Sequence, residues 1–237
     1  MKPRTPGFWL IVATVGLLAL LPMQALAGMT PEEVKVFEGY KARAEKGDPA
    51  GQYSLGFCYA NGDGVAEDKA EAVKWFRKAA DQGLAVAQSD LGMCYVWGIG
   101  VAVNQVEGVK WYRKAADQGF AEAQSNLGMC YCLGRGGLGK NNMIEAVKWW
   151  RKAADQGYAV AQSNLGMCYD DGTGVARDYV EAYALYKLAE KTNEEAGKRL
   201  ATLEKFLSHE ATLRGQKRSK EIQKEIDANI ASKKAGK

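Results

Sequence analysis

Hydrophobic and polar positions along the chain fall into blocks that each predict two short helices. In one block, apolar residues recur at three- and four-residue spacing from about Leu84 to Trp97 and again from about Gln105 to Asp117. The glycines of segment 98–101 interrupt the pattern, and Asn104 stands where a helix-capping residue is expected. Such a helix pair cannot bury both of its apolar faces alone, so the blocks must stack on one another.

This block recurs along the chain. The stretch AADQGLAVAQSDLGMCY begins at Ala79, returns almost unchanged from Ala115 and from Ala153, and occurs in a looser form from Ala42. The three close copies start 36 and then 38 residues apart. A period of this length is typical of arrays of helical pairs. The sequence therefore predicts an all-α fold, an α-solenoid of stacked helix-turn-helix repeats with helical caps, its four repeats covering residues 44–79, 80–115, 116–153 and 154–189.

The residues that recur in these blocks carry a family resemblance. Their shared pattern A-x-x-G-x-x-x-A-Q-x-x-L-G-x-x-Y-x-x-G-x-G-V-x-x-D-x-x-x-A-x-x-W-x-x-K-A-A resembles the Sel1-like repeat, a relative of the tetratricopeptide repeat, over residues 44–189 of the 237. The resemblance implies a solenoid that binds other molecules, usually proteins. Three departures stand out: Gly51 replaces an alanine, the third repeat has two extra residues in its turn, and Leu185 replaces the tryptophan of the other repeats.

The segments that flank the repeats indicate a leader and helical caps. Residues 1–27 have the basic start, the 14-residue apolar run and the small-x-small site of a cleaved signal peptide. An uncleaved anchor is the alternative, but this run is shorter than the roughly 20 residues of a membrane span. We therefore expect a periplasmic or secreted protein without stable membrane insertion. Residues 28–43 and 190–230 are predicted to be capping helices, and residues 231–237 a disordered tail.

Positive charge is concentrated at the carboxyl end. Residues 197–237 carry 11 Lys and Arg against 5 Asp and Glu, whereas residues 28–196 carry 19 against 23. The basic end is either a solvated terminal helix or a tail that binds a polyanion or the cell envelope. An exported protein meets no nucleic acid, so we do not expect nucleic-acid binding.

Catalytic motifs are weak in this sequence. Residues 134–140 match a phosphate-binding loop, but a predicted helix precedes them and Asn141 follows where Ser or Thr is needed, which favours an expanded turn. The single histidine, His209, lies in the terminal region and supports no catalytic triad. Some cysteine-rich members of the Sel1-like family have been linked to β-lactam binding or hydrolysis, yet the S-x-x-K motif of such serine chemistry is absent here. We expect no enzyme activity, cofactor or metal site.

Helical geometry divides the five cysteines. Four of them are predicted to share the buried face of the first helix in each repeat, at Cys58, Cys94, Cys130 and Cys168. Successive helices stack about 9–10 Å apart, whereas a disulfide needs Cα atoms within about 7 Å. These four are therefore predicted to be reduced core thiols. Cys132 has no repeat equivalent and is placed opposite the buried face, which predicts an exposed thiol and a Cys132-linked dimer.

The side of the first helices that points away from the core is the predicted binding surface, because in stacked repeats the first helix lines the concave side. Methionines there are adaptable apolar contacts, and asparagines can hydrogen-bond the backbone of an extended peptide. Packing between repeats is the alternative for the methionines. Trp97, which has no copy, is either a partner contact or a packing residue. The predicted partner-binding residues are Phe57, Met93, Met129, Met167, Asp90, Asn126, Asn164, Trp97 and Leu133.

Taken together, the sequence favours an exported scaffold or adaptor that binds a protein or peptide on its concave face. A β-lactam-binding or hydrolysing enzyme and a secreted factor that engages a host protein are the alternatives. Mid-helix glycines add a structural expectation. Gly92, Gly128 and Gly166 are predicted to allow the close approach of a neighbouring helix, which would offset their low helix propensity.

Overall fold

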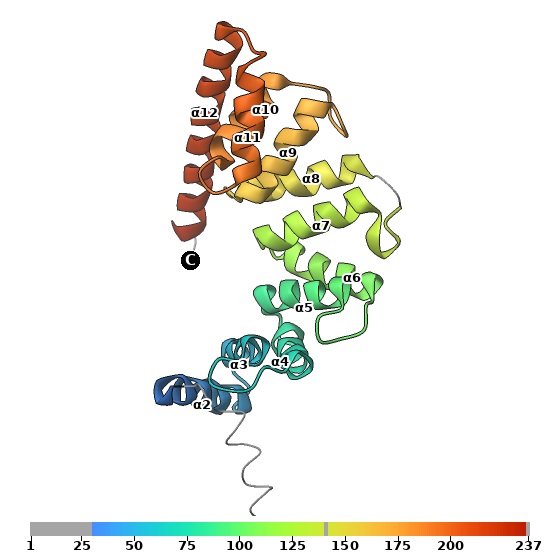
Figure 1. Ribbon diagram of the computed structural model, residues 1–237, viewed down its shortest axis with the longest axis vertical. Helices are drawn as coiled ribbons and strands as arrows, with labels where there is room; N and C mark the ends of the chain where they lie inside the picture. Colours follow the sequence, from blue (N-terminus) through green and yellow to red (C-terminus); the bar gives the residue numbers. More distant parts are fainter. Residues whose placement is uncertain (1–29, 140–141, 236–237) are drawn as a thin grey trace, which may run out of the picture. The chain divides into compact units, whose positions relative to one another are not determined.

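The computed structural model describes residues 30–139 and 142–235, and within these residues the chain is helical and contains no β-strand (Figure 1). The predicted leader lies outside the described residues. The all-α prediction is confirmed. The chain begins with α2 (Pro31–Glu45). Four helix pairs follow, which are the four repeats: α3 (Pro49–Asn61) with α4 (Lys69–Asp81), α5 (Ala85–Trp97) with α6 (Gln105–Asp117), α7 (Ala121–Leu133) with α8 (Met143–Ala154), and α9 (Ala159–Asp171) with α10 (Tyr179–Ala189). Two further helices, α11 (Glu194–Glu204) and α12 (His209–Ala235), come after the repeats.

The helices belong to two compact units. The first unit contains α2, α3 and α4 together with the turn residues 99–101, and the second contains α5 to α12. In the first unit α2 packs on α3, and α3 on α4. In the second unit each helix from α5 to α10 packs on the next, and α12 packs mainly on α10.

Side-chain caps set where the second helix of each repeat begins. Asp68, Asn104, Asn142 and Asp178 each accept a hydrogen bond from the backbone N–H three residues further on, at 2.9, 3.0, 3.3 and 3.1 Å. These bonds satisfy donors that the first turn of a helix leaves without a partner. The predicted caps are therefore confirmed in all four repeats.

Turn glycines lie against the start of an earlier helix. Gly100 has a φ of +67°, and a Cβ at this position would lie 2.1 Å from the carbonyl oxygen of Lys69 at the start of α4. Gly174 has the same relation to Met143 at the start of α8, at 2.6 Å. Only glycine has both the left-handed conformation and the room that this contact requires. In both cases the turn glycine lies against the backbone at the start of an earlier second helix.

The third repeat keeps this contact despite its two extra residues. Gly136, in the 3₁₀ turn Arg135–Gly137, lies against Gln105 at the start of α6, where a Cβ would be 2.7 Å from the carbonyl oxygen. The element that precedes the turn is α7, a helix, whereas a phosphate-binding loop follows a strand. The structure thus agrees with the expanded turn predicted from the sequence.

The two helices of a repeat approach closely at a glycine on the first helix. A Cβ on Gly92 would lie 2.8 Å from the ring of Tyr112, and one on Gly128 would lie 2.7 Å from the ring of Trp150. Gly166 has the same relation to Tyr186 at 2.8 Å. The predicted close approach is confirmed, and the neighbour is in each case an aromatic side chain of the second helix.

Buried glutamines tie the helices together at the opposite end of the first and third repeats. Gln124 of α7 donates through Nε2 to the carbonyl oxygen of Ala116, at 3.1 Å, and its Oε1 accepts from Nε2 of Gln156, at 2.8 Å. Gln52 has the corresponding partners, Ala44 at 3.4 Å and Gln82 at 2.8 Å. One side chain thus links the end of the preceding helix to the turn that follows its own repeat.

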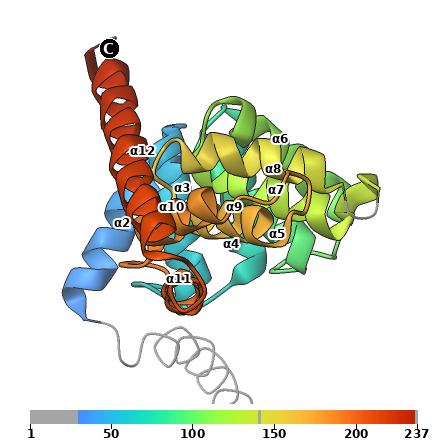
Figure 2. The ribbon, with the colours of Figure 1, turned by 90° about the horizontal axis from the view of Figure 1, so that it is seen from above.

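The helices at the carboxyl end differ from the prediction in one respect. Two helices were expected after the repeats and two are found, but α12 continues to Ala235 (Figure 2). Residues 231–235 are therefore helical, which corrects the predicted disorder of this part of the tail. Lys233 and Lys234 lie in the last turn, where their positive charges interact favourably with the negative end of the helix dipole. Lys233 also donates through Nζ to Oε1 of Gln156, at 3.1 Å.

Candidate protein-binding surface

The first helices of the second unit carry most of the predicted binding residues, and we call their non-core side the first-helix face. Its apolar members differ widely in exposure. Met93, Trp97 and Leu133 are 37%, 58% and 51% exposed. They lie in the second half of α5 and at the end of α7, so two consecutive repeats each expose apolar side chains on this face.

The other two methionines of this face are half-buried. Met129 packs against the core cluster that α8, α9, α10 and α12 build, and Met167 packs against the cluster of α10 and α11. Each therefore leans on the repeat or helix that follows it in the array. For Met129 and Met167 the structure favours the alternative of packing between repeats, whereas Met93 remains available for a partner.

Polar side chains run along the same helices. Asp90 and Asn126 are half-buried, but Asn164 is only 7% exposed, and its Nδ2 donor finds no acceptor among the described residues. The sequence placed Asn164 on the open surface. It is covered because α9 is packed between α8 and α10 and also contacts α11. Asn164 is therefore a buried residue and not part of the exposed surface.

Trp97 has a partner that the sequence did not reveal. The guanidinium carbon of Arg135, in the expanded turn of the third repeat, lies 4.1 Å from the centroid of the Trp97 ring. This distance is within the range of a cation–π contact. Trp97 is therefore a packing residue on one side of its ring and exposed on the rest. Leu133, two residues before Arg135 in the chain, is exposed as well.

Negative charge gathers on the first-helix face near Glu122. Burial, and then the charge of Asp90, raise the pKa of the Glu122 carboxyl group. Burial, and then the charge of Glu122, raise the pKa of Tyr158 at the start of α9. These couplings place Asp90 and Glu122, from consecutive first helices, within electrostatic reach of each other. Glu122 was missed from the sequence, although it replaces the valines found at Val86 and Val160 in the neighbouring repeats.

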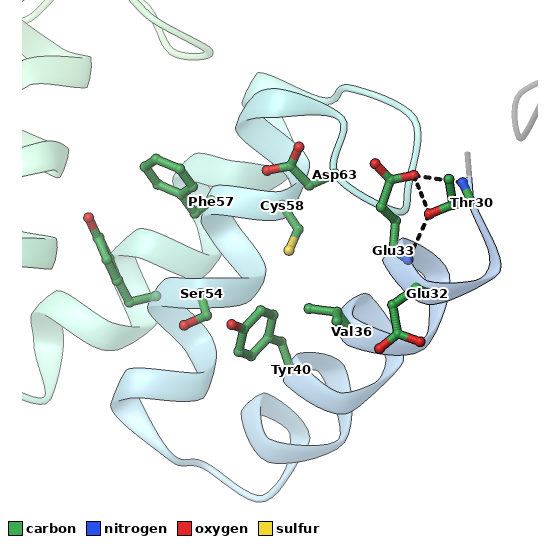
Figure 3. Close-up of a pocket in the computed structure, with 10 residues that line it drawn as sticks. Thr30, Glu32, Glu33, Val36, Tyr40, Ser54, Phe57, Cys58 and Asp63 are labelled. Atoms are coloured by element: carbon green, nitrogen blue, oxygen red, sulfur yellow. Dashed lines mark hydrogen bonds between the residues drawn. The ribbon is translucent and has the colours of Figure 1, made fainter. Parts of the chain in front are cut away.

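Phe57 belongs to the first unit, where it borders a groove of ≈ 630 Å³ between α2 and α3 (Figure 3). The apolar lining of the groove comes from Val36 and Tyr40 of α2 and from Tyr53 and Phe57 of α3. The sequence indicated Phe57 alone. It could not indicate the groove, because α2 is not part of the repeat and its register against α3 is set by packing.

The cysteines are arranged as predicted, with one exception. Cys58, Cys94, Cys130 and Cys168 are buried free thiols, and burial raises the pKa of the last three to about 11. Cys132 was expected to be exposed. It is half-buried against the core cluster that α8, α9, α10 and α12 build, and burial raises its pKa as well. The lower thiolate fraction makes Cys132 less reactive than an open surface cysteine.

Three further observations concern the described part of the chain. No three His, Cys, Asp or Glu side chains lie close enough there to hold a metal ion. None of its helices has the length and apolar character needed to cross a membrane. His209, the first residue of α12, is exposed.

Comparison with known families places these features in context. The profile of the Sel1 repeat matches residues 49–84, 85–120, 121–158 and 159–191. The chain belongs to the Sel1 repeat family. Each matched segment begins at the first helix of a pair, about five residues later than the limits read from the sequence, but the number of repeats is the same. The Sel1 repeat is a fold generally used for protein–protein interaction.

Two solved structures show the same fold. One is a protective antigen present in uropathogenic Escherichia coli strains that displays an SLR fold. It is 34% identical, with a TM-score of 0.76, and the match covers 91% of this chain and 46% of the antigen. The chain thus spans less than half the length of that protein. The other is a Sel1 repeat protein from Oxalobacter formigenes, 36% identical, with a TM-score of 0.62 and coverage of 76% and 74%. No curated protein matches the chain.

Proposed function

We propose that the protein is an exported Sel1 repeat scaffold that binds a protein or peptide partner on the first-helix face of its second unit, the side predicted to be concave. The exposed apolar stripe of Met93, Trp97 and Leu133 carries this proposal. Soluble proteins rarely leave such side chains exposed in register on neighbouring elements unless they contact a partner. Trp97 and Arg135 also belong to the residue types that dominate binding energy at protein interfaces.

The proposed mechanism is reversible recognition without a covalent step. The apolar stripe would bury side chains of an extended segment, and Asn126 can both donate to and accept from the backbone of that segment. The half-buried carboxylate of Glu122 favours a lysine or arginine in the partner, because a positive charge would offset the cost of its burial. The partner that fits this face best is therefore an extended, partly basic polypeptide.

Affinity capture with the mature chain tests the proposal. We expect that Trp97→Ser combined with Leu133→Ser reduces recovery of the bound partner at least tenfold, because both exposed anchors are lost. The matched control is Val106→Ser combined with Ile144→Ser, which removes exposed apolar side chains from the second helices α6 and α8. Equal recovery by both double variants would place the binding site elsewhere.

Export is part of the proposal and has its own measurement. Fractionation of cells that express the full chain should recover a protein shortened by the leader of residues 1–27, in the periplasm or the medium. The same fractions decide between a periplasmic adaptor and a secreted factor.

A further inference from the structure

The groove of the first unit has the character of a socket for an aromatic side chain next to a positive charge. Val36 and Phe57 on its walls are both exposed, and the half-buried rings of Tyr40 and Tyr53 extend its apolar surface. The ten lining residues include three carboxylates, from Glu32, Glu33 and Asp63, and no lysine or arginine (Figure 3).

Two of these carboxylates are available to a ligand. Glu33 is engaged in the cap of α2, where its Oε2 accepts from the backbone N–H of Thr30 at 2.6 Å and from its hydroxyl at 2.9 Å. Glu32 and Asp63 form no ion pair with any lysine or arginine of the described residues. Asp63 accepts only a long hydrogen bond from Nδ2 of Asn61, at 3.4 Å. Among the described residues, no lysine or arginine pairs with the carboxylates of Glu32 and Asp63, which lie beside an apolar hollow.

The end of the second unit offers the complementary group. Phe206, in the turn between α11 and α12, is 80% exposed. Its neighbour Lys205 is exposed, whereas Arg199 in the same surface region is already paired with Glu195, at 2.9 Å. Backbone hydrogen bonds hold this turn in one conformation: Lys205 N–H donates to Thr202 at 3.2 Å, and Phe206 N–H donates to Leu203 at 3.1 Å. An ordered turn loses little conformational entropy when it binds.

We propose that Phe206 of one copy inserts into the groove between α2 and α3 of a second copy, with Lys205 facing the carboxylates of Glu32 and Asp63. The phenyl ring of Phe206 would pack against the apolar side chains that line the groove, and the positive charge of Lys205 would attract the carboxylates of Glu32 and Asp63. The two surfaces are different, so the contact is heterologous and leaves one groove and one Phe206 free at the ends of every assembly. Chains would therefore associate head to tail, independently of the partner bound on the first-helix face.

Light scattering of the mature chain provides the first measurement. The weight-average mass should rise with concentration between about 10 and 500 µM, because one aromatic anchor and one charge pair give weak association. It should fall when NaCl is raised from about 0.05 to 0.5 M, because salt screens the exposed charges. A monomer at every concentration overturns the proposal, and so does a mass that is independent of concentration.

Two complementary variants make the test specific. Phe206→Ser removes the inserted ring, and Val36→Asp blocks the groove, so each variant alone should remain monomeric. An equimolar mixture should form a 1:1 dimer and nothing larger, because each molecule retains one working surface. The control, Ile144→Ser, changes an exposed side chain elsewhere and should associate like the wild type. Association of either blocked variant with itself, or the lack of a dimer in the mixture, overturns the proposal.

The result can be separated from that of the proposed function. Phe206→Ser and Val36→Asp leave Trp97 and Leu133 intact, so both variants should still capture the partner of the first-helix face. If Val36→Asp instead loses a captured protein while the wild type stays monomeric, the groove binds another protein and head-to-tail association is excluded.

Discussion

At the scale of single residues, glycines decide how closely the two helices of a repeat pack. A Cβ on Gly128 would lie 2.7 Å from two atoms of the Trp150 indole, and the indole Nε1 donates to the carbonyl oxygen of Ser125 at 3.1 Å. The indole thus covers the backbone of α7 at the one position that lacks a side chain. A mid-helix glycine costs about 1 kcal/mol of helix propensity, which the contact with a large aromatic ring offsets.

We predict that Gly128→Leu lowers the free energy of unfolding by more than about 2 kcal/mol, because the new side chain must displace Trp150. The measurement is urea denaturation followed by circular dichroism. Gly39 provides the matched control: it lies within α2, and no atom lies within 4 Å of the position of its missing Cβ. Gly39→Leu should leave stability unchanged or raise it. Similar losses in both variants would show that helix packing at Gly128 is not limited by space.

Residue positions that depend only on their own repeat could be predicted from the sequence. The caps, the mid-helix glycines and the four buried cysteines belong to this group. Met129, Asn164 and Cys132 could not be placed correctly, because a helical wheel shows only how a side chain points relative to its own core. Whether the next repeat covers that side depends on how the repeats are stacked, and the sequence does not contain this information in a simple pattern.

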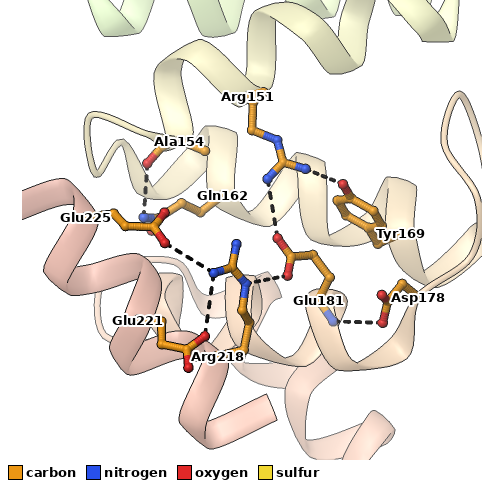
Figure 4. A network of polar contacts seen from close by, with 9 residues as sticks. All are labelled: Arg151, Ala154, Gln162, Tyr169, Asp178, Glu181, Arg218, Glu221 and Glu225. Carbon is orange, nitrogen blue, oxygen red and sulfur yellow. Dashed lines mark hydrogen bonds and ion pairs between the residues drawn. The ribbon is translucent and has the colours of Figure 1, made fainter. Parts of the chain in front are cut away.

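At the scale of elements, a half-buried charge cluster fixes α12 against the last repeats (Figure 4). Arg218 of α12 donates through Nε to Glu181 of α10 at 2.9 Å and pairs with Glu225 at 3.3 Å and Glu221 at 3.7 Å. Glu181 also binds Arg151 of α8, at 3.3 Å. Three helices therefore meet at one carboxylate, whose side chain is 13% exposed.

We predict that Arg218→Met destabilises the protein by about 1–2 kcal/mol, because Glu181 loses a charged hydrogen bond at a partly buried site. Hydrogen exchange should show faster exchange of the α12 amides. Lys217→Met is the control, because Lys217 is largely exposed and its ion pair with Glu221 is long, at 4.0 Å. If the two variants exchange alike, the cluster around Glu181 does not hold α12 in place.

The existence of α12 could be predicted from its helical spacing, but its neighbours could not. Outside the repeats there is no copy with which to compare it, so the sequence indicated a cap without a docking position. The same reason explains why the groove beside α2 was missed. In both cases the repeat period predicts how helices pack inside the array, but it gives no information about the helices that cover its ends.

At the scale of the whole molecule, each of the two compact units has a core of its own. In the first unit Phe37 of α2 packs with Leu55 and Cys58 of α3. In the second unit Ile222 and Ile226 of α12 join a cluster that includes Trp150 and Leu165 from two different repeats. The terminal helix is thus a structural part of the second unit, and the packing of α8, α9 and α10 depends on it.

This dependence gives a prediction that distinguishes the two units. Ile226→Asp should destabilise the second unit by more than about 3 kcal/mol, because it buries a carboxylate in place of a fully buried apolar side chain. Hydrogen exchange should rise in α8, α9 and α10, while α3 and α4 keep the protection they have in the wild type. Ile230→Asp is the matched control: it lies one turn further along the same stripe but is 40% exposed, against 2% for Ile226. Its effect should stay within about 0.5 kcal/mol. Equal loss of protection in both units after Ile226→Asp would mean that they unfold as one body.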